Sequence, residues 1–124
     1  MESPITSTPL SRYYAVVVLY QSSSEASNYE TLYEEEIAIV LATSDEDARE
    51  RAIAHAKEQE DTYRNGRGEL VTHQFKVIKD VHLMPPEIES GTTIYSRFFR
   101  DLSSYEAFEA DASGRLESAS ASAV

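Results

Sequence analysis

The fold is decided by residues 13–21, which have the sequence YYAVVVLYQ. Valine and tyrosine dominate this stretch, and β-branched and aromatic side chains favour extended backbone because they pack well on a pleated surface. The serines of residues 22–24 follow it, a composition typical of a loop. We therefore expect a strand here, and because apolar residues occupy both parities, both of its faces need cover from water.

A second strand is predicted at residues 33–42, after a loop longer than a tight turn. Apolar residues again occupy both parities: Ile37, Ile39 and Leu41 on one, and Ala38, Val40 and Ala42 on the other. We expect the two strands to pair as a hairpin.

A helix is predicted to begin after Ser44. The Ser44 hydroxyl can accept a hydrogen bond from the backbone amide of Asp47, and the acidic residues 45–47 are favoured by the helix dipole. Small residues then recur at helical spacing: Ala48, Ala52 and Ala56. They allow a helix to lie close to a sheet. We expect the pattern to continue to Tyr63 and to end at the Asn-Gly pair of residues 65–66.

Two more strands are predicted downstream. Within residues 69–84, side chains of one parity are mostly apolar: Val71, His73, Phe75, Val77, Val81 and Leu83. This alternation predicts a long third strand, interrupted in pattern by Lys79 and ended by two prolines at residues 85–86. Residues 92–99, TTIYSRFF, are β-favouring and predict a fourth strand.

These elements predict one small α+β domain with the order β-β-α-β-β. We expect a mixed sheet with one amphipathic helix packed on one face. The domain spans residues 13–99 and follows a flexible segment at residues 1–12. A capping box formed by Ser103 and Glu106 predicts a short helix within residues 100–112. The low-complexity run at residues 113–124 predicts a disordered tail.

Four short pieces, taken in order, carry a resemblance to a known family. They are residues 14–20 (YAVVVLY), residues 32–37 (LYEEEI), residues 44–48 (SDEDA) and residues 95–98 (YSRF). Together they resemble the domain-of-unknown-function 4288 family over roughly residues 13–99. The resemblance implies a bacterial origin and the domain limits. The family is functionally uncharacterised, so the resemblance implies no activity, substrate or catalytic residue.

Composition argues against several classes of function. The formal net charge is −11, and a strongly acidic surface repels nucleic-acid backbones and anionic membranes. The chain has no cysteine, which excludes disulfides, thiolate catalysis and cysteine-based zinc sites. It starts without a stretch that resembles a signal peptide, and it has no apolar run of about 18 residues. We therefore expect a cytoplasmic protein.

The histidines do not form a metal-binding pattern. His73 and His82 are separated by an odd number of positions, so a regular strand points them to opposite faces. No His-Glu-x-x-His spacing accompanies these two or His55. The Asn-Gly-Arg-Gly run of residues 65–68 follows a predicted helix, whereas a phosphate loop precedes one, so this run predicts a turn. We expect no metal, no cofactor and no catalytic residue.

Two groups of residues are candidates for contact with a protein partner. Glu34, Glu35 and Glu36 place two carboxylates on one strand face and one on the other. They can bind a basic partner or protect a strand end as a solvated charge run. Tyr95 and Arg97 share one face of the predicted fourth strand, where a guanidinium near aromatic rings can grip a carboxylate or simply pack.

These observations favour a non-catalytic protein-interaction module, immunity-like or regulatory, whose acidic surface meets a basic protein. One helix covers one face of the sheet, so the segment around Tyr105 and Phe108, a second copy or another protein must cover the other. We expect a homodimer as the simplest cover. The alternatives are a small cofactor-free enzyme that uses carboxylates and tyrosines, which needs an enclosed pocket, and an accessory domain that only oligomerises.

Overall fold

A four-stranded sheet is the centre of the structure, which a computed structural model describes for residues 10–108. The strands are β1 (Arg12–Ser24), β2 (Leu32–Ala42), β3 (Asp61–Arg64) and β4 (Leu70–Leu83). They lie in the order β2-β1-β4-β3, so β2 and β3 are the edges. Every pairing is antiparallel, and the prediction of a mixed sheet is therefore wrong. Residues 1–9 of the predicted N-terminal segment and the predicted tail at residues 113–124 lie outside the described residues.

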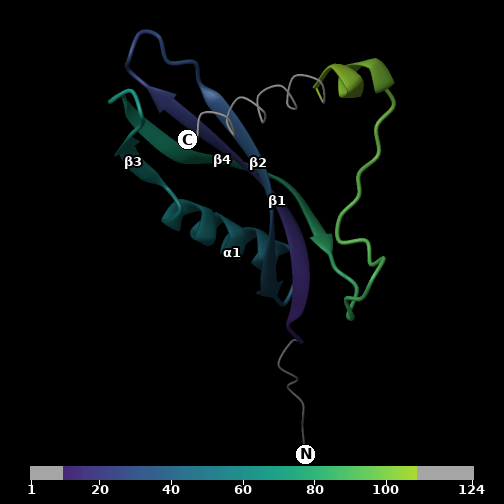
Figure 1. Cartoon of the computed structure of the whole chain (residues 1–124). Coiled ribbons are helices and arrows are strands. Elements are labelled where there is room, and N and C mark those ends of the chain that lie inside the picture. Colours follow the sequence, from purple (N-terminus) through teal and green to yellow (C-terminus); the bar gives the residue numbers. More distant parts are fainter. Residues whose placement is uncertain (1–9, 109–124) are drawn as a thin grey trace, which may run out of the picture.

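The helix α1 (Asp45–Glu58) covers one face of this sheet (Figure 1). Ser44 caps the helix as predicted, because its Oγ accepts a hydrogen bond from the Asp47 amide at 3.0 Å. The alanines expected to face the sheet are buried: Ala48, Ala52 and Ala56. They form one core with side chains of β1: Tyr14, Val16, Val18 and Tyr20. The α+β class, with one helix packed on one face, is confirmed.

The helix ends at Glu58, and its predicted extension to Tyr63 is wrong. Residues 61–64 form β3 instead, which pairs with β4 as a hairpin. Threonine and tyrosine favour this extended backbone. The Glu60 carboxylate helps to hold it in place, because Oε2 accepts a hydrogen bond from the Phe75 amide at 3.0 Å. Gly68 occupies the left-handed region in the turn, with φ 77°.

Two β-bulges in β4 change which of its side chains reach the core. The register with β1 skips Lys76 and Lys79. Each skipped residue reverses the alternation of faces. Val77, expected on the same face as the other apolar residues of β4, therefore turns away from α1, and Ile78 is buried in its place with 6 % exposure. The two reversals cancel, so the predicted parity holds again beyond Lys79.

The face of the sheet opposite α1, which we call the second face, lies beside the segment that follows β4. We call this segment, residues 85–108, the arm. Two prolines end β4 at residues 85–86, and Gly91 turns the backbone with φ 92°. Figure 1 shows the arm, in green, passing the sheet on the side away from α1. Residues 92–99 of the arm contain no strand, and the predicted fourth strand is wrong. Backbone that crosses over a sheet face cannot join the hydrogen-bond ladder at an edge.

The described part of the arm ends in a short helix at residues 102–108, which confirms the predicted C-terminal helix. Its cap is Asp101 and not the predicted Ser103. Asp101 Oδ1 accepts a hydrogen bond from the Ser104 amide at 3.2 Å, and Asp101 Oδ2 accepts one from the Ser104 hydroxyl at 2.7 Å. A carboxylate one residue before the helix therefore satisfies its first free amides.

Candidate interaction surface

The arm crosses the second face from β4 to β2. Over β4, the Tyr95 hydroxyl donates a hydrogen bond to Asp80 Oδ2 at 3.2 Å, and the Tyr95 ring meets the His82 ring edge-on with centroids 6.2 Å apart. Over β2, Arg97 Nη1 lies 3.9 Å from Glu35 Oε2. Because β1 lies between β4 and β2, the arm passes over β1.

The buried part of the second face is the middle of β1. Ala15 and Val17, whose side chains point to this face, are exposed by only 0 % and 2 %. The contacts of the arm on either side of β1 come from Tyr95 and Arg97. The cover over β1 is thus the middle of the arm. The segment around Tyr105 and Phe108, which was one of the three covers that the sequence allowed, forms the helix at residues 102–108 and stays exposed.

The polar contacts between the arm and the sheet are weak. The side chains of Arg97 and Glu35 are both about half exposed, and exposed ion pairs contribute about 0–1 kcal/mol. Burial raises the pKa of Tyr95, and its hydrogen bond to Asp80 raises the pKa further. Tyr95 therefore remains a neutral donor at physiological pH. The arm rests on the sheet through a few side chains, without a backbone ladder.

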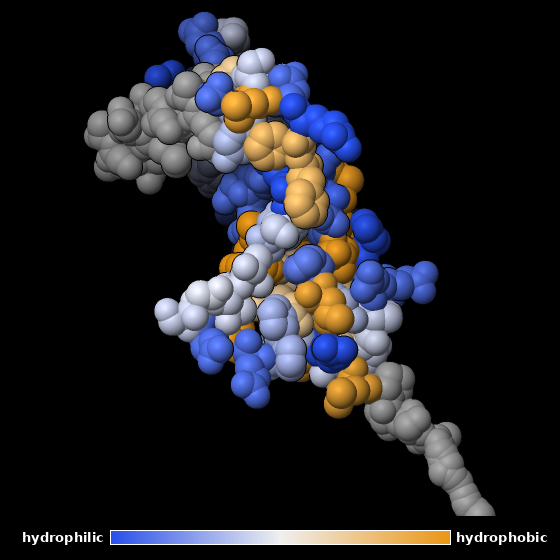
Figure 2. Space-filling view, turned by 90° about the vertical axis from the view of Figure 1, so that its right-hand side faces the viewer, coloured by the Kyte–Doolittle hydropathy of each residue, from blue (hydrophilic) through white to orange (hydrophobic). Residues whose placement is uncertain are grey.

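Along β2 the arm reaches Glu35, but the apolar side chains on the same face stay about half exposed. Large side chains that are about half exposed form a row along it: Tyr33, Ile37, Ile39 and Leu41, with Tyr13 of β1 paired to Leu41. Figure 2 views the molecule from the side of the arm, and orange hydrophobic side chains reach the surface there among blue hydrophilic ones. Exposed apolar groupings of this kind often mark interaction sites.

The three glutamates of β2 are divided between the faces as predicted. The register places Glu34 and Glu36 on the α1 side and Glu35 on the second face. Glu36 Oε1 accepts a hydrogen bond from the Tyr20 hydroxyl at 3.4 Å. Burial and then the charge of Glu36 raise the pKa of Tyr20 to about 12. Glu35 and Arg97, which the sequence offered as separate contacts for an outside partner, meet each other in the structure.

A family model described as "Domain of unknown function (DUF4288)" matches residues 13–96. The chain belongs to this family. The DUF4288 match includes nearly all of β1, the whole of β2, α1, β3 and β4, and the arm as far as Ser96. It confirms the resemblance found in the sequence. Neither a curated protein nor a solved structure gives a significant match. Within the described part of this DUF4288 chain, no helix is long and apolar enough to cross a membrane.

The DUF4288 domain also contains a buried serine–histidine contact that the sequence did not predict. Ser22 Oγ lies 3.1 Å from His73 Nδ1, and the His73 ring stacks on Tyr20 with centroids 4.8 Å apart. Ser22 is 9 % exposed, and a buried hydroxyl needs a hydrogen-bond partner. The alternation of side chains along β1 places Ser22 and Tyr20 on the same face. The pairing of Ser22 with His73 depends on the register between β1 and β4, which the sequence alone does not give. We interpret the contact as structural.

The three histidines of the domain lie apart. His73 is on the α1 side of β4 and His82 is on the second face, as their spacing predicted, because the two bulges between them cancel. His55 is exposed on α1. Within residues 10–108, no group of three or more His, Cys, Asp or Glu side chains is arranged to hold a metal ion.

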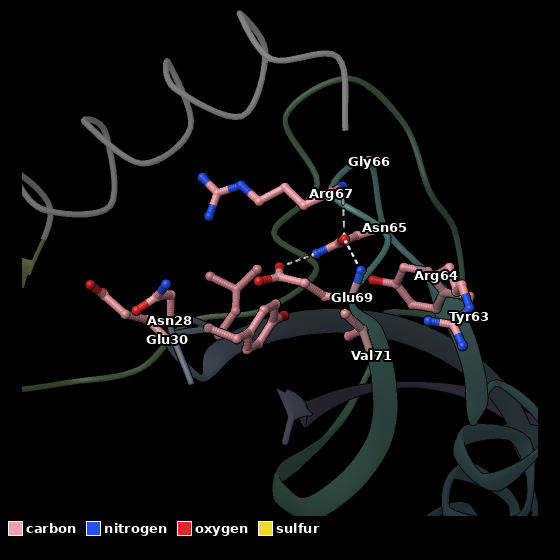
Figure 3. Close-up of a pocket in the computed structure, with 11 residues that line it drawn as sticks. Asn28, Glu30, Tyr63, Arg64, Asn65, Gly66, Arg67, Glu69 and Val71 are labelled. Atoms are coloured by element: carbon pink, nitrogen blue, oxygen red, sulfur yellow. Dashed lines mark hydrogen bonds between the residues drawn. The ribbon is translucent and has the colours of Figure 1, made fainter. Parts of the chain in front are cut away.

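A cleft of about 750 Å³ opens between the β1–β2 loop and the β3–β4 hairpin (Figure 3). Tyr29 lines it from the loop, and Tyr63 lines it from the hairpin. Asn65 Oδ1 accepts hydrogen bonds from the amides of Arg67 and Glu69, both at 3.0 Å, and Asn65 Nδ2 donates one to Glu69 Oε1 at 2.8 Å. The Asn65 side chain therefore builds the turn that was predicted at residues 65–68, and its polar atoms are engaged within the hairpin.

Proposed function

We propose that this DUF4288 domain is a non-catalytic protein-interaction module that pairs β2 with β2 of a second copy to form a two-fold dimer. The observation that carries the proposal is the row of half-exposed apolar side chains along β2, which is an edge strand. A two-fold contact of this kind uses the same strand in both copies, so one exposed surface supplies both halves of the interface.

The open edge of β2 supports the proposal. An edge strand presents unpaired backbone donors and acceptors, which form a template for another strand. β2 has 11 residues, whereas the other edge strand, β3, has only 4. A second copy added at β2 therefore gains a much longer hydrogen-bond ladder than one added at β3.

The sequence of β2 suits pairing with itself. Ile37 is the midpoint of Leu32–Ala42, so an antiparallel pair centred on Ile37 gives every residue of the strand a partner. In this register, Glu35 lies opposite Ile39 of the second copy, and no glutamate faces a glutamate. Like charges placed directly opposite each other destabilise a strand pair. The centred register avoids this cost and brings the apolar rows of the two copies together.

The expected energies also favour association. A large apolar side chain contributes about 1.5–3 kcal/mol when it is fully buried, and each favourable cross-strand pair in a paired edge contributes about 0.2–1 kcal/mol. The net charge of −11 on each chain opposes association. That repulsion is screened beyond about 8 Å at physiological salt, so short-range burial outweighs it.

Charge substitutions at Ile39 test both the interface and its register. Ile39→Glu places a carboxylate opposite Glu35 of the second copy, and we expect the Kd for self-association to rise by about tenfold or more. Ile39→Lys faces the same Glu35 with a positive charge and should weaken the dimer less. The measurement is sedimentation velocity over a concentration series at 0.15 M salt, a condition of about 8 Å screening length.

Leu70→Glu is the matched control. Leu70 and Ile39 are both 51 % exposed on the second face, but Leu70 lies at the β3 side of the sheet. We expect Leu70→Glu to leave the Kd unchanged. An equal loss of association for Leu70→Glu and Ile39→Glu would place the interface elsewhere. Equal effects of glutamate and lysine at Ile39 would reject the centred register.

A further inference from the structure

We infer that the arm continues past the free edge of β2 onto the second copy, where Phe98 and the residues after it pack on the second face beside Ile39 of that copy. The inference rests on the proposed function, and it assigns a partner surface to the part of the arm that follows Arg97.

The arm runs from β4 towards the edge strand β2. Tyr95 lies over β4, and Arg97 reaches Glu35 on β2, so within two residues the contacts of the arm move from β4 past β1 to the edge strand. Within residues 10–108, no further strand of the same sheet lies beyond β2. The described residues of the arm after Arg97 therefore have no strand of their own sheet to pack on beyond β2.

The large apolar side chains of the arm after Arg97 are exposed. Phe98 is 98 % exposed, and it follows directly after Arg97, whose side chain lies beside Glu35 of β2. Phe99 stacks on Tyr105 of the arm itself, with centroids 4.6 Å apart, yet stays 53 % exposed. Leu102 and Phe108 are also more than half exposed. Large apolar side chains that are exposed together can mark an interaction site.

The proposed pairing of β2 supplies a matching surface at the right place. Opposite Glu35 in the centred register stands Ile39 of the second copy, which belongs to the uncovered apolar row. Paired strands lie about 4.8 Å apart, and an extended chain advances about 3.3 Å per residue. Phe98 and Phe99 follow the residue that contacts Glu35, so they come within reach of the neighbouring strand.

Charge complementarity favours the same occupant. The arm carries Arg97 and Arg100 where it leaves the sheet, and of the three glutamates of β2 only Glu35 lies on the second face. The nearest acid of the arm, Asp101, is engaged as the cap of the short helix through its bonds to Ser104. The second face of a second copy therefore offers an apolar row and one carboxylate, that of Glu35, to an aromatic, basic segment.

Thiol cross-linking tests the inference directly, because the chain has no native cysteine. A tagged chain with Phe98→Cys and an untagged chain with Ile39→Cys are co-expressed, purified as full-length protein and treated with a short bismaleimide. We expect a cross-linked product that contains one tagged and one untagged chain. Ile88→Cys is the control in the tagged chain, because Ile88 is exposed by 61 % but precedes the crossing point of the arm. It should give little of this product.

A separate variant, Ile37→Cys, reports the β2 pairing alone, because in the centred register Ile37 lies opposite Ile37 of the second copy at the two-fold axis. If Ile37→Cys cross-links but Phe98→Cys does not reach Ile39→Cys of the other chain, the dimer stands and the inference about the arm is overturned. A double variant Phe98→Cys/Ile39→Cys that links only within one chain also overturns it, since the arm then folds onto its own β2. If Ile37→Cys gives no cross-linked dimer, the proposed function fails and the inference fails with it.

Discussion

The two faces of the sheet are closed by different means. On the α1 side, small alanines let the helix approach closely, and every member of the core cluster is exposed by 6 % or less. On the second face, the arm reaches across the middle of β1 through one hydrogen bond, one ring contact and one loose ion pair. The apolar row of β2 stays half exposed. One face is thus closely packed, and the other leaves apolar side chains exposed, where we propose that a second copy binds.

Overpacking the closed face should give the largest loss of stability. Ala52 is 2 % exposed between α1 and the sheet, so Ala52→Leu forces added volume into a filled core. We expect a loss of about 1–3 kcal/mol in the free energy of unfolding, measured by urea denaturation. Ala54→Leu is the control, because Ala54 lies on the exposed side of the same helix. Equal stabilities of the two variants would mean that α1 is not packed closely on the sheet.

The buried phenol of Tyr20 should make the α1 side sensitive to alkaline pH. Its folded-state pKa is raised from 10.0 to about 12, so the folded protein resists an ionisation that the unfolded chain allows. The stabilising effect is fully present below about pH 10 and is lost as the pH rises towards 12. A pKa unit corresponds to about 1.4 kcal/mol. Tyr20→Phe removes this group and should flatten the fall in stability between pH 10 and 12.

The control for this titration is Tyr13→Phe, on the half-exposed row of the second face. Denaturation at a series of pH values should show the same alkaline fall in stability for Tyr13→Phe as for the unsubstituted protein. A Tyr20→Phe protein that loses stability just as steeply would show that the Tyr20 phenol does not couple folding to pH.

Breaking a contact of the arm should have the smallest effect. Tyr95→Phe removes the hydroxyl that donates to Asp80 but keeps the ring against His82. Because the bond is exposed, we expect a loss of about 0.5–1 kcal/mol. Tyr105→Phe, which keeps the stack on Phe99, is the control. If Tyr95→Phe lost as much stability as Ala52→Leu, the second face would be held as firmly as the α1 side, which would contradict the proposed difference between the two faces.

Local patterns in the sequence predicted β1, β2 and the start of α1, because each depends on side chains near in the chain. The parity of Tyr14–Tyr20 and the cap at Ser44 needed no knowledge of distant partners. The bulges at Lys76 and Lys79 could not be predicted in this way, since a bulge exists only relative to the strand with which β4 pairs. The expected order β-β-α-β-β holds only because β3 takes the place of the strand that residues 92–99 do not form.

The candidate interaction surface was predictable only in part, for the same reason. Residue type and strand alternation pointed to residues 34–36, Tyr95 and Arg97 as contact residues, and the apolar residues on both faces of β1 and β2 indicated a second face in need of cover. The meeting of Glu35 with Arg97 depends on the path of the arm over the sheet. The prolines that end β4 and the turn at Gly91 indicate that the backbone changes direction there. They do not indicate over which strands the arm then passes.

The most direct test of the central claim is the molar mass of the unsubstituted full chain by light scattering, measured over a dilution series at physiological salt. We expect a dimer, with twice the chain mass of 13.9 kDa, at micromolar concentration and a return to monomer on dilution. A mass of 13.9 kDa at every accessible concentration would contradict the claim that a second copy covers β2.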